Sequence, residues 1–77
     1  MRRNKLRQRR VNKNITVPQI AILLGISQSY YYKIEAGIRN PTLILAAEIA
    51  SILNSSIDEL FFDLVLDGTY RKRLKQN

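Results

Sequence analysis

The stretch TVPQIAILLGISQSYYYKIEAG, residues 16–37, decides the fold because it predicts two short helices joined by a tight turn. Thr16 and Gln19 have the spacing of a capping box, in which each residue bonds the backbone of the other at a helix start. Gly25 suits the left-handed end of that helix, and Ser27 can cap the next one. Only three residues separate the two helices, and such a glycine-containing turn is typical of a helix-turn-helix unit.

Three consecutive tyrosines in the second of these helices must point in different directions, because each residue turns by about 100°. Tyr31 shares a face with Ile34 and is predicted to be the buried tyrosine. Tyr30 lies on the flank and Tyr32 on the opposite face, so both are predicted to be exposed. The predicted exposed face also carries Gln28, Ser29 and Lys33.

The flanking sequence predicts three more helices. Residues 4–13 form a polar segment with a narrow apolar stripe, which is typical of a surface helix. Thr42 can cap a helix that is apolar around most of its circumference and is therefore predicted to be central. Ser56 and Glu59 have capping-box spacing and start a last helix at Ile57. No segment alternates as a strand would, so the expected fold class is all-α, a compact domain of five short helices.

Length and composition exclude several classes of function. A chain of 77 residues is expected to form one small domain. It contains no cysteine and no histidine, which removes disulfides, the usual zinc ligands and common nucleophile–base pairs. We therefore expect no metal, no cofactor and no enzymatic activity. No apolar run approaches the ~20 residues that span a bilayer, and no signal peptide is evident, so a cytoplasmic protein is expected.

The positive charge is concentrated at the two ends of the chain. The net charge is +7, and seven of the thirteen Lys and Arg residues lie within the first thirteen positions. Four more lie between Arg71 and Lys75, whereas all six acidic residues lie between Glu35 and Asp67. Basic ends favour a polyanionic partner such as nucleic acid. Charge alone fits a merely soluble basic protein equally well.

Residues 6–61 resemble the Cro/lambda-repressor-like, or Xre-type, helix-turn-helix domain. The resemblance rests on a spaced set of motifs: Ala21, Gly25, Ile34-Glu35-Ala36-Gly37, Asn40-Pro41-Thr42-Leu43 and Ser56-Ile57-Asp58-Glu59-Leu60. It implies a lambda-repressor-like fold of five helices, usually dimeric, that binds operator DNA and regulates transcription. The helix-turn-helix would then lie at the second and third helices.

In such a domain the start of the second helix of the unit enters the major groove. Gln28 can make two hydrogen bonds to adenine, and Ser29 is short enough to contact any base. Lys33 can reach guanine or a phosphate, and Tyr30 can pack on a thymine methyl or donate its hydroxyl. These four residues are the predicted base contacts.

Helix starts and loop cations predict the contacts with the DNA backbone. Val17 would contribute only its backbone amide, because its side chain is apolar. The resemblance also implies that Arg10 pairs with Glu35, which would turn Arg10 toward a phosphate. The predicted backbone contacts are Arg10, Thr16, Val17, Tyr32, Arg39, Asn40 and Thr42.

The sequence from Leu60 to Tyr70 is more apolar than a surface tail needs to be. A domain this small cannot bury all of these side chains, and an exposed apolar surface usually marks an interface. We predict a homodimer interface formed by Leu60, Phe61, Phe62, Leu64, Val65 and Leu66. The domain is thus expected to span residues 1–66, and residues 67–77 form a basic tail. A longer parent protein, cut at this point, is the alternative explanation of the apolar segment.

The sequence therefore favours a dimeric, sequence-specific transcriptional regulator, a repressor of phage or mobile-element type, with double-stranded operator DNA as its partner. The alternative is an antitoxin-like protein that binds a partner protein through the apolar segment and regulates its own synthesis through DNA. A basic RNA or membrane-surface binder is disfavoured, because aromatic residues on strands and a broad apolar face on the first helix are both missing.

Overall fold

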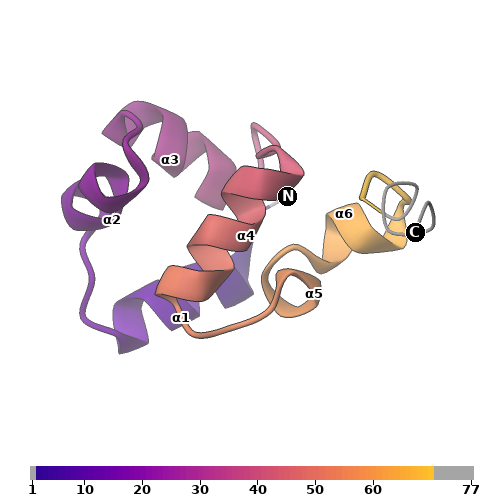
Figure 1. Cartoon of the computed structure of the whole chain (residues 1–77), viewed down its shortest axis with the longest axis horizontal. Helices are drawn as coiled ribbons and strands as arrows, with labels where there is room; N and C mark the ends of the chain where they lie inside the picture. The colour runs from indigo at the N-terminus through magenta and orange to yellow at the C-terminus, as the bar shows by residue number, and fades with distance from the viewer. Residues whose placement is uncertain (1, 71–77) are drawn as a thin grey trace.

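The computed structural model describes residues 2–70, which contain six helices and no strand. The helices are α1 (Asn4–Asn12), α2 (Val17–Leu24), α3 (Gln28–Glu35), α4 (Leu43–Ile52), α5 (Ile57–Leu60) and α6 (Phe62–Leu66) (Figure 1). The all-α class predicted from the sequence is confirmed. Within the described range no helix is long and apolar enough to cross a membrane.

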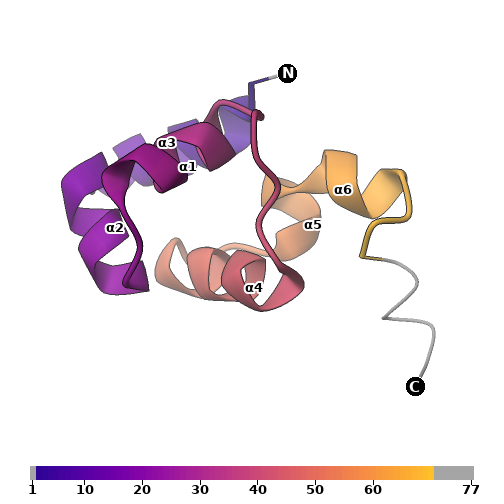
Figure 2. The same ribbon diagram turned by 90° about the horizontal axis from the view of Figure 1, so that it is seen from above.

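The six helices surround one core. Helices α1 and α3 lie along one side of the domain and α4 along the other, α2 closes one end between them, and α5 and α6 lie at the opposite end (Figure 2). Helix α3 contacts α1 and α2, and α4 contacts α2 and α5. The largest fully buried side chains are Leu6, Ile20, Tyr31, Ile34, Ile49, Leu53 and Phe61. Helix α4 is central as predicted, although it buries only one face and leaves Ile44 exposed.

Short-range hydrogen bonds fix the helix starts where the sequence places them. The capping box at α2 is complete, since Thr16 Oγ1 accepts from the Gln19 amide and Gln19 Oε1 accepts from the Thr16 amide. Ser27 caps α3 and Thr42 caps α4 in the same way, each accepting from an amide three residues on. Gly25 has φ of +70°, the left-handed conformation that glycine adopts without strain, so the tight turn into α3 is intact.

The last predicted helix is divided in two, so the described chain has six helices rather than five. Phe61 separates α5 from α6 with φ of −126° and ψ of 42°, which bends the chain and lets its ring enter the core. The second capping box is also incomplete. Ser56 Oγ accepts from the Glu59 amide, but the Glu59 carboxylate bonds Ser55 and Arg9 instead of turning back to Ser56.

The bend at Phe61 corrects the predicted interface in this segment. Leu60, Phe61 and Leu64 are buried within a single chain and offer no surface to a second copy. Val65 is half-buried and packs against the core. Phe62 and Leu66 are each 60% exposed, so only these two keep the exposure that the prediction required.

The predicted domain boundary after residue 66 is also too early. Residues 67–70 turn back onto the domain, and Tyr70 is only 3% exposed. Its hydroxyl donates to the Pro41 carbonyl at 2.7 Å, which joins the end of the described chain to the loop before α4. Residues 71–77, which hold the basic residues of the predicted tail, lie outside the described residues.

The three tyrosines of α3 occupy three different environments. Tyr31 is fully buried, as predicted, and Tyr32 is 51% exposed. Tyr30 was predicted to be exposed but is half-buried, because its position on the flank of α3 lets its ring pack against the core.

We predict that Tyr31→Ala lowers the free energy of unfolding by ~3 kcal/mol or more, as expected for a large-to-small change in a packed core. Tyr32→Ala is the matched control, on the same helix and exposed, and should change stability by about 0.5 kcal/mol or less. Urea denaturation of both variants measures the difference. Equal stability of the two variants would contradict this assignment of the buried ring.

Candidate nucleic-acid interface

The first turn of α3 presents short polar side chains to solvent. Gln28 and Ser29 are exposed. Tyr32 lies one turn beyond Gln28 on the same face, and half-buried Lys33 lies one turn beyond Ser29. The four side chains thus form one continuous polar strip along the helix. Tyr30, the remaining predicted base contact, lies beside this strip with half of its surface packed on the domain.

Backbone amides at the helix starts add hydrogen-bond donors to this region. The caps of α3 and α4 each use the amide three residues after the cap. An α-helix leaves its first amides without intrahelical partners, so Gln28, Ser29, Leu43 and Ile44 retain amides that can face a ligand. At α2 the cap uses the Gln19 amide and the preceding residue is proline. The start of α2 therefore retains a single such amide, that of Val17, which is half-buried.

The loop between α3 and α4 holds two of the predicted backbone contacts in exposed positions. Arg39 and Asn40 are exposed, whereas the adjacent Pro41 is buried and anchors the loop. The amides of Ile38 and Arg39 both donate to the Lys33 carbonyl, at 2.8 and 3.1 Å. These bonds fold the loop back onto the end of α3, next to Lys33 of the polar strip.

A buried ion pair fixes the angle between α1 and α3. Arg10 donates from Nε and Nη2 to the two carboxylate oxygens of Glu35, both at 2.9 Å, and from Nη1 to the Ile15 carbonyl. The Tyr31 hydroxyl donates to the same carboxylate at 2.8 Å. The hydrogen bonds from Arg10 to Glu35 raise the pKa of Arg10, so the guanidinium stays charged.

The predicted pairing of Arg10 with Glu35 is confirmed, but the position of Arg10 does not suit a phosphate contact. Arg10 is 9% exposed, and all three of its nitrogens already donate to protein oxygens. Its role in this structure is to hold α3 in place. Of the other predicted backbone contacts, Val17 is half-buried, and the exposed ones are Thr16, Tyr32, Arg39, Asn40 and Thr42.

Sequence reasoning missed a second buried arginine. Arg3 counted only as part of the basic N-terminal segment, yet it is 5% exposed. Its guanidinium donates to the carbonyls of Ile34 and Arg39, to Asn40 Oδ1 at 2.8 Å and to Asp63 at 3.1 Å. It also lies 5.5 Å from the centre of the Phe61 ring. These partners are 31 to 60 residues away in sequence, so no local pattern identifies them.

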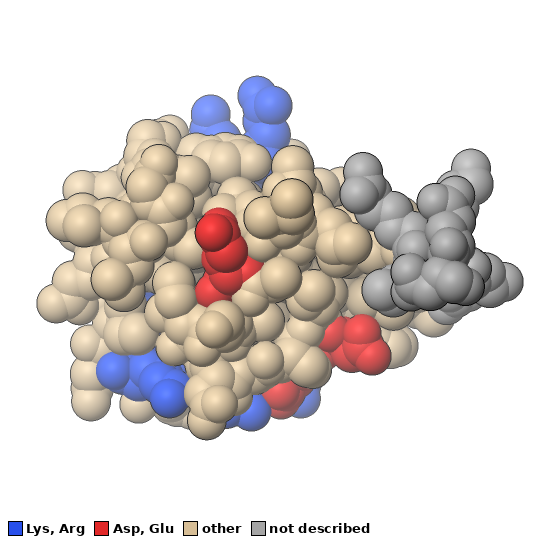
Figure 3. Space-filling model, viewed as in Figure 1, with Lys and Arg blue, Asp and Glu red and all other residues tan. Residues whose placement is uncertain are grey.

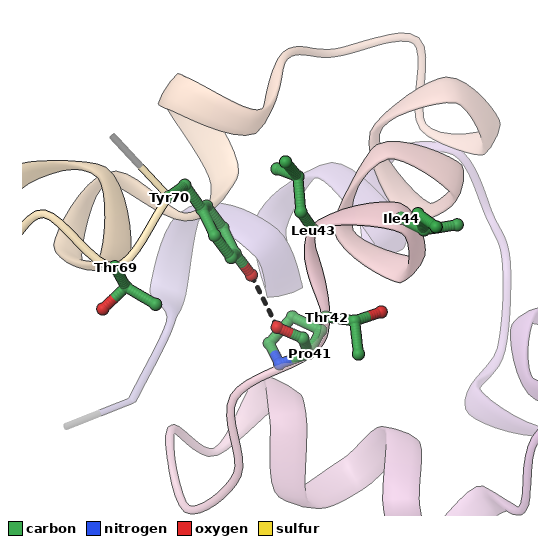
Figure 4. A pocket seen from close by; sticks show the side chains of 6 residues that line it. All are labelled: Pro41, Thr42, Leu43, Ile44, Thr69 and Tyr70. Atoms are coloured by element: carbon green, nitrogen blue, oxygen red, sulfur yellow. Dashed lines mark hydrogen bonds between the residues drawn. The ribbon is translucent and has the colours of Figure 1, made fainter. Parts of the chain in front are cut away.

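A pocket adjoins the start of α4, between that helix and the turn that follows α6 (Figure 4). Tyr70 and Thr69 form one wall, and the other is formed by residues 41–44. The Tyr70 hydroxyl points at the Pro41 carbonyl across this pocket. The pocket thus lies beside the loop of Arg39 and Asn40, and its walls come from the start of α4 and the turn after α6.

Charge is distributed unevenly over the surface. The face over α4 is largely uncharged with a small acidic area near its centre, and Lys and Arg atoms stand at its upper edge, above α3, and at its lower edge (Figure 3). Exposed cations on α1 are Lys5 and Arg7, while Arg2 precedes that helix and Lys13 follows it. The cations visible in this view therefore lie at the edges of the α4 face.

Comparison with known proteins agrees with this geometry. The helix-turn-helix family model matches residues 6–60, and the chain belongs to this family, of the Cro/lambda-repressor-like type. The chain is 37% identical over 60 residues to the HTH-type transcriptional regulator AnsR of Bacillus subtilis, covering 78% of this chain and 52% of that protein. It is 36% identical over 59 residues to an uncharacterized HTH-type transcriptional regulator of Methanocaldococcus jannaschii. That match covers 77% of this chain and 89% of the relative.

The chain thus spans about half the length of the Bacillus relative. No solved structure gives a significant match.

Burial of Tyr70 predicts a loss of stability in alkali. Burial raises the pKa of Tyr70 from 10.0 to about 12, so the folded state favours the neutral phenol. The resulting stabilisation is complete below pH 10, where an unfolded tyrosine is neutral, and is lost as the pH rises toward about 12. We expect Tyr70→Phe to lose less stability between about pH 8 and about pH 11 than the unmodified chain, as measured by urea denaturation. An equal loss in both would show that Tyr70 is not the titrating group.

Proposed function

We propose that this chain is a sequence-specific DNA-binding regulator of transcription, a cytoplasmic repressor without enzymatic activity that acts as a homodimer. The observation that carries the proposal is the polar strip on the first turns of α3, which is exposed and rigidly held. The two relatives, each an HTH-type transcriptional regulator, support the same class.

Base recognition would fall to the start of α3. Its first turn offers an amide side chain and a hydroxyl, which are the groups that read adenine and a range of base edges in the major groove. Gln28 and Ser29 would make the main base contacts. Lys33 can reach guanine as well, because the aliphatic part of its side chain is half-buried and its amine lies at the end of a long chain. Tyr30 can contribute its exposed edge. The buried Arg10–Glu35–Tyr31 network supports the proposal because it holds the opposite face of α3 in one position.

Backbone binding would come from the starts of α2 and α4 and from the loop between α3 and α4. Helix starts favour phosphates because unpaired amides and the helix dipole act together. Helix α4 has two such amides and follows the loop that holds Arg39, whereas α2 has one. We therefore assign the stronger phosphate contact to Arg39, Asn40 and Thr42, and a weaker one to Thr16 and Val17. Tyr32 can donate its hydroxyl to a phosphate from the polar strip.

A second copy of the chain is proposed to pack against α6. Phe62 and Leu66 are four residues apart and share one exposed face of that helix. Lys5, Asp58 and Glu59 line the surface beside Phe62, so charges of both signs surround the apolar centre. Such a patch can pair with its own copy across a two-fold axis. The two copies of α3 would then reach half-sites about 34 Å apart, one turn of DNA.

Binding to DNA is tested by operator selection with the purified chain, followed by salt titration of the selected duplex. We expect log K to fall steeply with log salt, because cations near phosphates release counterions. Gln28→Ala should relax the preference at one base pair per half-site and cost ~1–3 kcal/mol. Arg39→Ala should instead weaken selected and random DNA alike and reduce the salt slope by about 1.

Lys13→Ala serves as the control for charge, because Lys13 is exposed just after α1 and lies outside the proposed contacts. Selection of no preferred sequence by the unmodified chain would refute the proposed function. A variant lacking Gln28 that retains the full base preference would refute only the assignment of this residue.

Self-association through α6 is tested by Phe62→Asp, which places a charge in the apolar patch without entering the core. We expect the variant to remain folded, to sediment as a monomer and to bind the full operator much more weakly than the unmodified chain. Ile22→Asp, at an exposed apolar position on α2 outside the proposed contacts, is the control and should leave the dimer and operator binding intact. An unmodified chain that sediments as a monomer, both alone and on DNA, would contradict the homodimer and favour a different protein as the partner of α6.

A further inference from the structure

We propose that Arg3 is a positioning residue for DNA binding, which orients the Asn40 amide so that its donor end faces a phosphate. The inference rests on the proposed function, since it assigns the means by which the loop between α3 and α4 is held ready for DNA. Arg3 itself is buried and would not touch DNA. It would act through its hydrogen bonds to three acceptors on the loop and on the end of α3.

The geometry of Asn40 carries the first step. Its side-chain oxygen accepts a hydrogen bond from Arg3 Nη2 at 2.8 Å, while the residue as a whole is exposed. A side-chain amide has an oxygen acceptor and an NH2 donor on opposite branches. Holding the oxygen against Arg3 therefore turns the NH2 group outward. A phosphate has only acceptor oxygens, so the outward group is the one that it can bind.

The same guanidinium fixes the backbone on both sides of the loop. Arg3 Nη1 donates to the Ile34 carbonyl, in the last turn of α3, and to the Arg39 carbonyl at 3.1 Å. The Arg3 amide donates to the Glu35 carbonyl at 2.9 Å. One side chain thus spans the end of α3 and the two residues, Arg39 and Asn40, that are proposed to contact the DNA backbone.

Arg3 is also held by α6 and by the bend before it. Nη2 lies 3.1 Å from Asp63 Oδ2, and the guanidinium lies over the Phe61 ring. The Arg3 side chain is 3% exposed and that of Asp63 is 26% exposed, so the pair is weakly screened by solvent. Figure 2 shows the N-terminal end of the chain beside the loop that leads from α3 to α4. Arg3 therefore connects α6 to the loop, so that the position of the loop depends on that of α6.

A lysine cannot replace this arrangement even though it carries the same charge. The planar guanidinium offers five N–H donors in a fixed fork, whereas an ammonium offers three donors at one point. A single amine cannot reach Ile34, Arg39, Asn40 and Asp63 together. Arg3→Lys consequently preserves the electrostatic attraction of the N-terminal segment for DNA but releases the loop.

The test is a double-mutant cycle between Arg3→Lys and Asn40→Ala, with affinity measured on the selected duplex cut to one half-site. A single half-site keeps the result independent of self-association. We expect Arg3→Lys to weaken binding by about tenfold, within the range for coupled contacting groups. The double variant should bind no more weakly than the weaker single variant, because both changes remove the same contact. Thermal melting must show that each variant is folded at the temperature used.

Arg9→Lys is the matched control. Arg9 also joins α1 to the C-terminal helices, through Glu59 at 3.1 Å, but it makes no contact with the loop. The affinity of the Arg9→Lys variant for DNA should stay within about twofold of that of the unmodified chain, since an exposed ion pair contributes little. If Arg9→Lys weakens DNA binding as much as Arg3→Lys does, the loss does not come from the contacts between Arg3 and the loop. That result would overturn the proposal.

The outcomes separate this inference from the proposed function. Absence of DNA binding by the unmodified chain refutes the function itself. Normal binding by Arg3→Lys, or losses that add fully to those of Asn40→Ala, overturns the role of Arg3 alone. If Arg3→Lys does not fold, Asp63→Asn replaces it, because this change keeps Arg3 and loosens only its anchor on α6. A smaller loss that is again not additive with Asn40→Ala supports the proposal, and unchanged affinity overturns it.

Discussion

The buried contact between Arg10 and Glu35 is the interaction on which the arrangement of this domain depends. It joins α1 to α3 through two hydrogen bonds of 2.9 Å, and the Tyr31 hydroxyl completes the carboxylate shell. Removing one partner of such a pair leaves an uncompensated buried charge and typically costs about 3–5 kcal/mol, a large share of the stability of a domain this small. The orientation of α3 therefore depends on a charged group that is itself buried. The face of α3 opposite this contact is left free for recognition.

Ion pairs of this kind change how the basic N-terminal segment is understood. Arg3 and Arg10 are buried in salt bridges, and Arg9 is paired with Glu59 on α5. Three of the cations that make the segment look like a nucleic-acid arm thus stabilise the fold. Polar groups and amides, with a few exposed cations, would then provide the DNA-binding surface. Charge clustering in sequence points to the same class of partner as the proposed function but overstates the number of residues that would face it.

Sequence reasoning succeeded where the determining contacts are local or periodic. Thr16, Ser27 and Thr42 cap their helices through bonds to amides three residues away, and the burial of Tyr31 follows from helical periodicity. It failed where the contacts are distant. The division of the last helix depends on Phe61 entering the core beneath Arg3, 58 positions earlier in the chain. Apolar residues around the bend were consequently assigned to an interface, although three of them complete the core.

The central claim, that the start of α3 and the start of α4 form one DNA-binding surface, is tested most directly by amide NMR of the isotope-labelled chain. The selected duplex is added stepwise while the backbone resonances are followed. The account predicts the largest shifts at Gln28, Ser29, Asn40, Leu43 and Ile44, and small shifts at the exposed apolar residues of α2, Ile22 and Leu23. Shifts confined to α2 or α6, with α3 unchanged, would contradict it.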